Sequence, residues 1–490
     1  MWSLRSVAGC RRLGAVGSVA VAMGGWAAGT LPARDPWGLW FPRGSEAARP
    51  GVLLALAGLT LLVVAWWKYG RLVAEGAAVR VRATLATLGW WAAPLLLAPP
   101  LYSADVYSYI AQGAMVVEGH DVYRFGPSVL DPGGIGGAAA ASVGGHWTDT
   151  PAPYGPVFLL VAEAVASLSA GQIVPAVLGM RLVAVAALAL VVWSLLRLAP
   201  HRARTGALWL GALNPLLLIH VVGGMHNDGL MVGLLLAGTA LALRRGRWIA
   251  GSALVALAMM IKSPAALALL FIGVVVGRDT TGPLIRRAAK GLLGPGAVAA
   301  AVAVGATLLA GTGFGWLRTQ SVAGTIHTAL SLTSDLGLAL GESMHYLSGT
   351  EPDPVKRAVQ AMGLTLALAL IAYLASCAAR GMLDPLHALG LALFALVALS
   401  PMVQPWYLLW ATPVLAATSW NGRTGRAVTV LSAALVYETA PDGRTPAYCF
   451  ALAAVACVIA AQLLLRRADF AAGIWLPSPR RVEEREPSRA

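Results

Sequence analysis

The sequence has little charge for its length. Only 12% of its 490 residues are charged, about half the ~25% found in soluble globular domains. With 58% hydrophobic residues and a mean hydropathy of +0.71, the chain lacks the polar residues needed to cover a surface that faces water. It also lacks the short alternating segments of a membrane β-barrel wall, because its apolar stretches are continuous runs of Leu, Ala and Val. These absences exclude a soluble globule and a barrel, and they predict helices embedded in lipid.

Acidic residues and paired cysteines are also scarce. Against 36 Lys and Arg there are 22 Asp and Glu, which gives a net charge of +14. The basic residues gather in short loops, as the positive-inside bias distributes them, so we predict no nucleic-acid partner. The four cysteines form no CxxC pair, so neither a disulfide framework nor a metal site is indicated. The chief basic loops are 68–82, 197–204, 244–247, 278–290 and 466–467.

The apolar runs between these loops predict an all-α polytopic integral membrane protein with about 14 transmembrane helices. If the basic loops and both termini are cytoplasmic, successive spans must alternate between the two sides. The run at 156–169 has only 14 residues, fewer than the ~17 needed to cross unaided, so we expect a re-entrant or interfacial helix there. The predicted spans are 13–31, 51–67, 84–100, 173–196, 206–222, 229–243, 248–261, 264–277, 292–311, 358–378, 385–400, 405–419, 427–440 and 446–465.

This threading predicts one transmembrane domain over residues 1–465 and a disordered cytoplasmic tail at 466–490, rich in Arg, Glu and Pro. Two long loops, 101–156 and 312–357, then face the exterior. The exterior loops carry the carboxylates, histidines and aromatic residues, whereas the cytoplasmic loops carry little besides Arg and Lys. Such a distribution favours an enzyme that works at the exterior face of the plasma membrane.

The first exterior loop begins with two tyrosines on either side of an aspartate. If residues 101–109 are helical, Tyr102, Asp105 and Tyr109 lie on one face. A partly desolvated carboxylate in that position is suited to act as general base on a sugar hydroxyl. An interfacial helix with an aromatic belt and a solvated aspartate would have the same spacing, so both interpretations remain open from the residues alone.

The rest of this loop is too long for a connecting turn. Loops of about 55 residues are functional or disordered, and the aromatic and charged residues here argue against disorder. Carbohydrate stacks on such aromatic side chains, although a structural cap over the bundle would have the same composition. Asp121, Tyr123 and Tyr154 are therefore candidates for ligand binding.

A second exterior turn contains His226, Asn227 and Asp228. Ionisable groups at membrane depth are costly and are functional candidates by default. The alternative is that Asn227 and Asp228 cap the helix that follows. His220, six residues before His226, is expected to be a core histidine with satisfied ring nitrogens.

Two further exterior turns add a cation, an amide and two aromatic rings. Lys262 lies outside in a chain that otherwise keeps lysine inside. A phosphate is its obvious partner, and snorkelling to lipid headgroups is the alternative. Gln404, Trp406 and Tyr407 lie at the same level, where an interfacial belt explains the aromatic residues equally well.

Four strings in this order now resemble a known family: PLYSADVYSYIAQGAMVVEGHDVY, TPAPYGPVF, NPLLLIHVVGGMHNDGLMVGLLLAG and SPMVQPWYLLW. They resemble the actinobacterial polyprenol-phosphate-mannose-dependent α-1,6-mannosyltransferases of the GT-C superfamily, which extend the mannan core of lipomannan. The resemblance runs from about Leu101 to Tyr407. It implies a GT-C-type fold and an inverting, metal-independent transfer that needs no cofactor, from polyprenyl-phosphate mannose to a mannan or lipomannan acceptor.

The resemblance also implies roles for individual residues. Asp105 occupies the position of the catalytic acid in the first large exterior loop of GT-C enzymes. Many of these enzymes have two adjacent acids, whereas this sequence has Ala104-Asp105, so a second acid is Asp228, Asp121 or absent. The donor-binding candidates are Lys262, His226, Asn227, Asp228 and Tyr154, and the acceptor or sugar-binding candidates are Tyr102, Tyr109, Asp121, Tyr123, Gln404, Trp406 and Tyr407.

Two other functions remain as alternatives. A transporter or flippase of lipid-linked saccharide would place ionisable groups near the middle of the bilayer on facing halves of the protein, whereas here they are predicted at one face. A polymerase that uses polyprenyl diphosphate would need more than one exterior cation.

Overall fold

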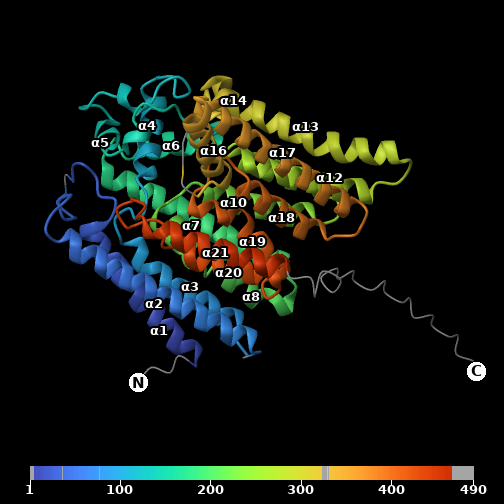
Figure 1. Ribbon diagram of the computed structural model, residues 1–490, viewed down its shortest axis with the longest axis horizontal. Helices are drawn as coiled ribbons and strands as arrows, with labels where there is room; N and C mark the ends of the chain where they lie inside the picture. The colour runs from blue at the N-terminus through green and yellow to red at the C-terminus, as the bar shows by residue number, and fades with distance from the viewer. Residues whose placement is uncertain (1–4, 36, 77, 323–327, 329, 466–490) are drawn as a thin grey trace, which may run out of the picture.

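The computed structural model describes residues 5–35, 37–76, 78–322, 328 and 330–465 (Figure 1). Every regular element in these ranges is a helix, which confirms the all-α prediction for the described part of the chain. The predicted tail at 466–490 lies outside the described residues.

Five of the described helices are long and apolar enough to cross a membrane. A sixth span is counted if two helices separated by a bend are taken as one. The chain is therefore a multi-pass membrane protein, while the count of about 14 spans stays a prediction, because many expected spans form helices of only 12 to 16 residues. The five are α2 (Ala48–Ala74), α7 (Ile173–Leu198), α13 (Leu284–Ala310), α17 (Pro352–Ala379) and α21 (Tyr448–Leu465).

Further helices accompany these five in the described ranges, besides short 3₁₀ helices at Pro127–Val129, Gly145–Trp147, His201–Ala203 and Gly313–Gly315. They are α1 (Val7–Ala28), α3 (Val81–Leu96), α4 (Asp105–Val117), α5 (Gly137–Ala140), α6 (Pro156–Leu168), α8 (Arg204–Gly211), α9 (Pro215–Leu217), η4 (Leu218–Gly223), α10 (Asp228–Ala242), α11 (Trp248–Met259), η5 (Ser263–Ala266), α12 (Leu267–Asp279), α14 (Trp316–Thr319), α16 (Leu332–Ser348), α18 (Pro385–Ala398), η7 (Pro405–Tyr407), α19 (Leu408–Ser419) and α20 (Arg423–Leu435). Within the expected exterior loop 312–357, α14 and α16 are helical, so this segment has regular structure of its own.

The span expected at 206–222 is not one straight helix. It consists of α8, α9 and the π-helical η4, and its two halves are bent by 51°. The break falls just before Pro215, because the proline ring would clash with a helical turn that precedes it and the residue lacks an N–H donor. Asn214 begins the second half, because its side-chain oxygen accepts a hydrogen bond from the N–H of Leu216 at 2.9 Å.

The helices α3 and α10 define two ends of the bundle. α3 leads directly toward Asp105, and α10 starts at Asp228, so both residues lie at one end, which we call the site end. Arg82 at the start of α3 and Arg244 after α10 lie at the other, which we call the basic end. With 16 residues in α3 and 15 in α10, these ends are separated by about 22–24 Å along the helices.

At the site end, α4, α5, α6 and α14 form a cover over the longer helices (Figure 1). α6 has 13 residues and is about 20 Å long, which is less than the ~30 Å of a bilayer core. It starts beside α11, where Val157 N–H donates to Met260 O at 3.1 Å. The turn that follows it packs Gly171 against the backbone of Ile135, in the loop that precedes α6. Both ends of α6 therefore contact segments of the site end, and a re-entrant or interfacial position of this helix stays a prediction.

Candidate active site

Asp105 is the first residue of α4. Ser103 supplies the hydrogen bond that starts this helix, because its Oγ accepts from the N–H of Asp105 at 3.1 Å. The prediction that residues 101–109 form one helix is therefore wrong in its first turn. Tyr102 has a φ of 64°, in the left-handed region, and its N–H donates to Pro441 O at 2.9 Å. A left-handed residue interrupts a right-handed helix, so Tyr102 does not share a face with Asp105.

The carboxylate of Asp105 has two partners. Nδ1 of His226 lies 3.2 Å from its Oδ2, and the side chain of Asp105 is 18% exposed while that of His226 is fully buried. Tyr109 donates its hydroxyl to the same Oδ2 at 3.4 Å. Because Nδ1 faces a carboxylate oxygen, we assign the ring proton to this nitrogen. Asp105 is thus held from two sides and retains an opening to solvent.

These partners determine the charge state of the carboxylate. Burial acts to raise the pKa of Asp105, but the hydrogen bond and charge of His226 and the charge of Lys262 outweigh it. The net effect is a pKa below the ordinary value of an aspartate. Asp105 is therefore ionised at neutral pH and able to accept a proton.

His226 belongs to a stack of rings. Its imidazole lies over the Trp406 ring with centroids 3.7 Å apart and planes 22° apart. His220, in η4, approaches both rings, at 5.6 Å from His226 and 5.1 Å from Trp406, and Tyr102 packs edge-on against His220 at 6.1 Å. Met225 has a φ of 56°, and this left-handed turn between η4 and α10 aims His226 back toward the stack.

Several buried polar atoms in this region have no partner among the described residues. They are the ring nitrogens of His220 and His226, the hydroxyl of Tyr102, the side-chain oxygen and nitrogen of Asn227, and the Nε1 of Trp406. Among them, Nδ1 of His226 has only its 3.2 Å contact with Asp105. His220 is fully buried, as predicted for a core histidine, but its ring nitrogens have no partner among the described residues. Since buried polar groups are nearly always hydrogen-bonded, this cluster next to a carboxylate is able to accommodate polar groups of a ligand.

A second charged pair lies close by. Lys262 Nζ is 2.9 Å from Oδ1 and 3.0 Å from Oδ2 of Asp228, and Trp410 donates its Nε1–H to Oδ1 of Asp228 at 2.6 Å. The ammonium also lies 4.6 Å above the Tyr407 ring and 5.6 Å above the Trp410 ring. Asp228 is thus used by an ion pair, and the side chain of Asn227 makes no capping hydrogen bond to α10.

Tyrosine side chains connect the two charged groups. The hydroxyl of Tyr109, which contacts Asp105, also accepts a hydrogen bond from the backbone N–H of Asn227 at 3.5 Å. Tyr154 packs edge-on against Tyr109 with ring centroids 5.4 Å apart, and Tyr123 donates its hydroxyl to Tyr154 O at 3.1 Å. The structure therefore joins Tyr109, Tyr154 and Tyr123 to the site end.

Two predicted site residues have other positions. Asp121 is exposed, and its Oδ1 accepts a hydrogen bond from Tyr123 N–H at 3.0 Å, so it stabilises a turn of the loop. Among the candidates for a second acid, the contacts connect Asp228 with the site and Asp121 only with this turn. Gln404 is half-buried at the start of η7, the short helix that carries Trp406 and Tyr407.

Arg181 is a residue that the sequence analysis missed. It is 4% exposed, and its Nη1 donates to Leu95 O at 2.6 Å and to Val222 O at 2.8 Å. Its Nη2 donates to Ala98 O at 2.8 Å. These carbonyls belong to the end of α3, which leads to Asp105, and the end of η4, which leads to His226. An isolated arginine within the apolar run 173–196 was the available signal, because ionisable residues at that depth are functional candidates.

Fold and site together define a multi-pass membrane protein with a partly exposed carboxylate and a buried ion pair at one end of its helices. Comparison with known families identifies which one. The chain belongs to the α-(1→6)-mannopyranosyltransferase family: residues 11–278 match the N-terminal domain of that family, and residues 333–466 match the MptB C-terminal domain. The resemblance predicted from the sequence is thereby confirmed, and the chain is a mannosyltransferase. The single domain expected over 1–465 stays a prediction.

Curated relatives extend over nearly the whole chain. A probable α-(1→6)-mannopyranosyltransferase of Mycolicibacterium smegmatis is 34% identical, covering 96% of this chain and 89% of the relative. The α-(1→6)-mannopyranosyltransferase A of Mycobacterium tuberculosis is 34% identical, and the match covers 96% of this chain and 92% of the relative. The α-(1→6)-mannopyranosyltransferase B of Corynebacterium glutamicum is 32% identical over 86% and 74%, respectively. No solved structure matches the chain.

Proposed function

We propose that this mannosyltransferase moves mannose from polyprenyl-monophosphate mannose to a mannan or lipomannan acceptor. The reaction forms an α-1,6 linkage with inversion at the exterior face of the plasma membrane, without a metal or cofactor. The observation that carries the proposal is the set of unpartnered buried polar atoms on His220, His226, Asn227 and Trp406 beside the partly exposed Asp105. Sugar hydroxyls are both donors and acceptors, and they are suited to satisfy such a set.

Asp105 is the general base in this reaction. It takes the proton from the 6-hydroxyl of the acceptor while that oxygen attacks the anomeric carbon of the donor mannose. The bond between the anomeric carbon and the phosphate oxygen breaks, and polyprenyl phosphate leaves with the bonding electrons. The 3.2 Å contact with Nδ1 of His226 and the hydrogen bond from Tyr109 hold the carboxylate in place for the attack.

Lys262 compensates the charge that develops on the departing phosphate. An ammonium has three N–H donors, and two of them are used by the oxygens of Asp228. The side chain of Lys262 is 17% exposed, so a phosphate oxygen is able to reach it. His226, Asn227, Asp228 and Tyr154 complete the proposed donor site, and Tyr109, Tyr123, Trp406 and Tyr407 complete the sugar and acceptor site.

A flippase is disfavoured by the placement of the charges. Asp105, His226, Asp228 and Lys262 lie together at one end of the helices, whereas a transport pathway needs ionisable groups near mid-bilayer on facing halves. The family membership supports the same choice.

The direct test is an assay of membranes that carry this protein, with radiolabelled polyprenyl-phosphate mannose and a short mannoside acceptor. We expect a labelled product that an α-1,6-specific mannosidase degrades. Asp105→Asn preserves size but removes the basic oxygen, so transfer should fall by about 10²–10⁴-fold with little change in donor binding. Asp131→Asn, an exposed acid of the same loop, is the matched control and should retain activity. Full activity of the Asp105 variant would refute the assignment.

A further inference from the structure

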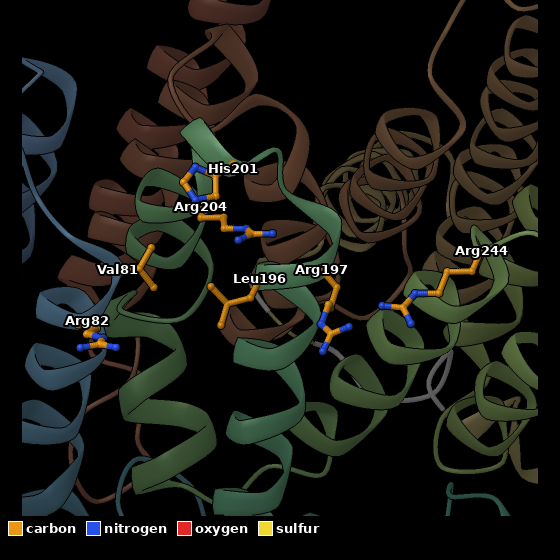
Figure 2. A pocket seen from close by; sticks show the side chains of 7 residues that line it. All are labelled: Val81, Arg82, Leu196, Arg197, His201, Arg204 and Arg244. Atoms are coloured by element: carbon orange, nitrogen blue, oxygen red, sulfur yellow. The ribbon is translucent and has the colours of Figure 1, made fainter.

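A cavity of about 680 Å³ opens at the basic end of the bundle. Four arginines and a histidine line it together with Val81 and Leu196 (Figure 2). They come from separate elements: Arg82 from the first turn of α3, Arg197 from the last turn of α7, Arg204 from the start of α8, and Arg244 from the residues after α10. The cavity is thus formed by folding and not by one basic stretch of sequence.

This basic pocket contains no compensating acid. Its lining residues include no carboxylate, and none of its four arginines forms a salt bridge with another residue in the part of the chain that the structure describes. Figure 2 shows the side chains of Arg204 and Arg244 extending from opposite sides toward Arg197. Like charges that converge in this way repel one another unless an anion lies between them.

The pocket also has an unsatisfied donor. Nε of Arg204 is buried and has no hydrogen-bond partner within the described ranges. Such a donor is costly unless a ligand satisfies it. Positive-inside charge alone requires neither a cavity nor a buried donor, so the topological role of these arginines does not account for the pocket.

Its position indicates the source of the anion. α7 has 26 residues and is about 39 Å long, so its last turn reaches the headgroup level of a bilayer whose core is ~30 Å thick. Trp193 and Leu243, near Arg197 and Arg244 in sequence, are 40% and 42% exposed. The pocket therefore combines a basic site with neighbouring apolar surface, as a lipid with a charged head and apolar tails requires.

We propose that this basic pocket binds the phosphate headgroup of an anionic phospholipid. The planar guanidinium groups match phosphate oxygens in a bidentate manner, and basic pockets between transmembrane helices are recognised sites for anionic headgroups. The pocket lies at the opposite end of α3 and α10 from Asp105, so it is a second site, independent of mannosyl transfer. A free phosphate has the same headgroup chemistry, and the experiment separates the two sources.

The test uses the full-length protein purified in nanodiscs that contain phosphatidylglycerol and phosphatidylcholine in equal amounts. Native mass spectrometry after release into detergent counts the phospholipids that each protein retains. We compare Arg197→Gln/Arg244→Gln, which alters two exposed pocket residues, with Arg202→Gln/Arg245→Gln, which alters two exposed residues of the same loops outside the pocket. Both variants lose the same net charge.

We expect the wild type and the control variant to retain phosphatidylglycerol in preference to phosphatidylcholine. The pocket variant should lose most of this preference, with at least about a tenfold drop in retained phosphatidylglycerol, as the loss of charge-assisted contacts predicts. Millimolar inorganic phosphate should not displace the lipid. Gel filtration and mannosyl transfer report whether each variant is folded, and Arg204→Gln provides a second pocket variant.

Three results would overturn the proposal. Equal retention by the wild type and both pocket variants would show that the pocket holds no lipid. An equal loss in the control variant would show that only the overall charge of the loops matters. Displacement of the lipid by inorganic phosphate would assign the pocket to a soluble anion.

Discussion

Replacing Lys262 with methionine tests whether its ammonium serves the donor or only balances Asp228. The pair is well defined, with Nζ 2.9 Å and 3.0 Å from the two carboxylate oxygens, and Asp228 is 1% exposed. Removing one partner of a buried pair costs about 3–5 kcal/mol. Because Trp410 still donates to Asp228 at 2.6 Å, we expect the lower end, about 3 kcal/mol of unfolding free energy.

The double variant Asp228→Asn/Lys262→Met separates the two roles. It removes both charges, and the amide oxygen of asparagine still accepts the hydrogen bond from Trp410. Most of the lost stability should therefore return, since the cost came from a buried charge without a partner. The donor contact should not return, because no cation remains near the phosphate. A charge-assisted contact contributes about 1.5–3 kcal/mol, which corresponds to a donor KM raised about 10- to 150-fold in both variants.

The measurements are thermal unfolding in detergent and the KM for donor and acceptor separately. Stability restored in the double variant with donor KM still raised is the expected outcome. If the double variant restores the donor KM as well, Lys262 only balances a buried charge and the donor role is refuted. If only the acceptor KM changes, Lys262 contributes to acceptor binding and the proposed donor contact is refuted.

Three further predictions concern the pH profile, Arg181 and the membrane topology. Because the pKa of Asp105 lies below its ordinary value, transfer should be lost only as the pH falls through that lowered pKa. His226→Phe removes one cause of the lowered pKa, so the loss of kcat/KM on the acidic side of the pH profile should move to higher pH. An unchanged pH profile would show that His226 does not lower the pKa of Asp105. Arg181→Lys leaves one ammonium for three carbonyls, so the unfolding free energy should fall by about 1–3 kcal/mol, and kcat should also fall. An unchanged kcat would show that Arg181 does not position the segments that lead to Asp105 and His226. In a background without the native cysteines, an impermeant thiol reagent on intact cells should label Ser167→Cys and not Arg245→Cys; labelling at position 245 would invert the topology.

The sequence predicted the parts of the fold that depend on composition. Low charge and continuous apolar runs led to an all-helical membrane protein, and the four motifs led to the family. The bend at Pro215 was also readable, since proline breaks a helix, but the apolar run across it favoured a single span. Periodicity likewise favoured a helix through Tyr102, whose left-handed φ depends on a contact with Pro441, more than 300 residues away.

The site was predictable residue by residue but not as an arrangement. Asp105, His226, Asp228 and Lys262 were each candidates because charged and polar groups are rare in this chain. Their pairing was not visible, because Asp228 and Lys262 are 34 residues apart in sequence and Asp105, at the start of α4, meets His226 in the distant turn before α10. The unpartnered nitrogens of His220 depend on what surrounds the ring, which no local pattern encodes.

Arg181 has a consequence for motion during the catalytic cycle. By binding the carbonyls of Leu95, Ala98 and Val222, it fastens the segments before Asp105 and before His226 to α7. Charge-assisted bonds of this kind cost about 1.5–3 kcal/mol each to break, so the two segments move as one rigid body with that helix. Loss of this side chain is therefore expected to loosen both segments together, and with them the 3.2 Å contact between Asp105 and His226.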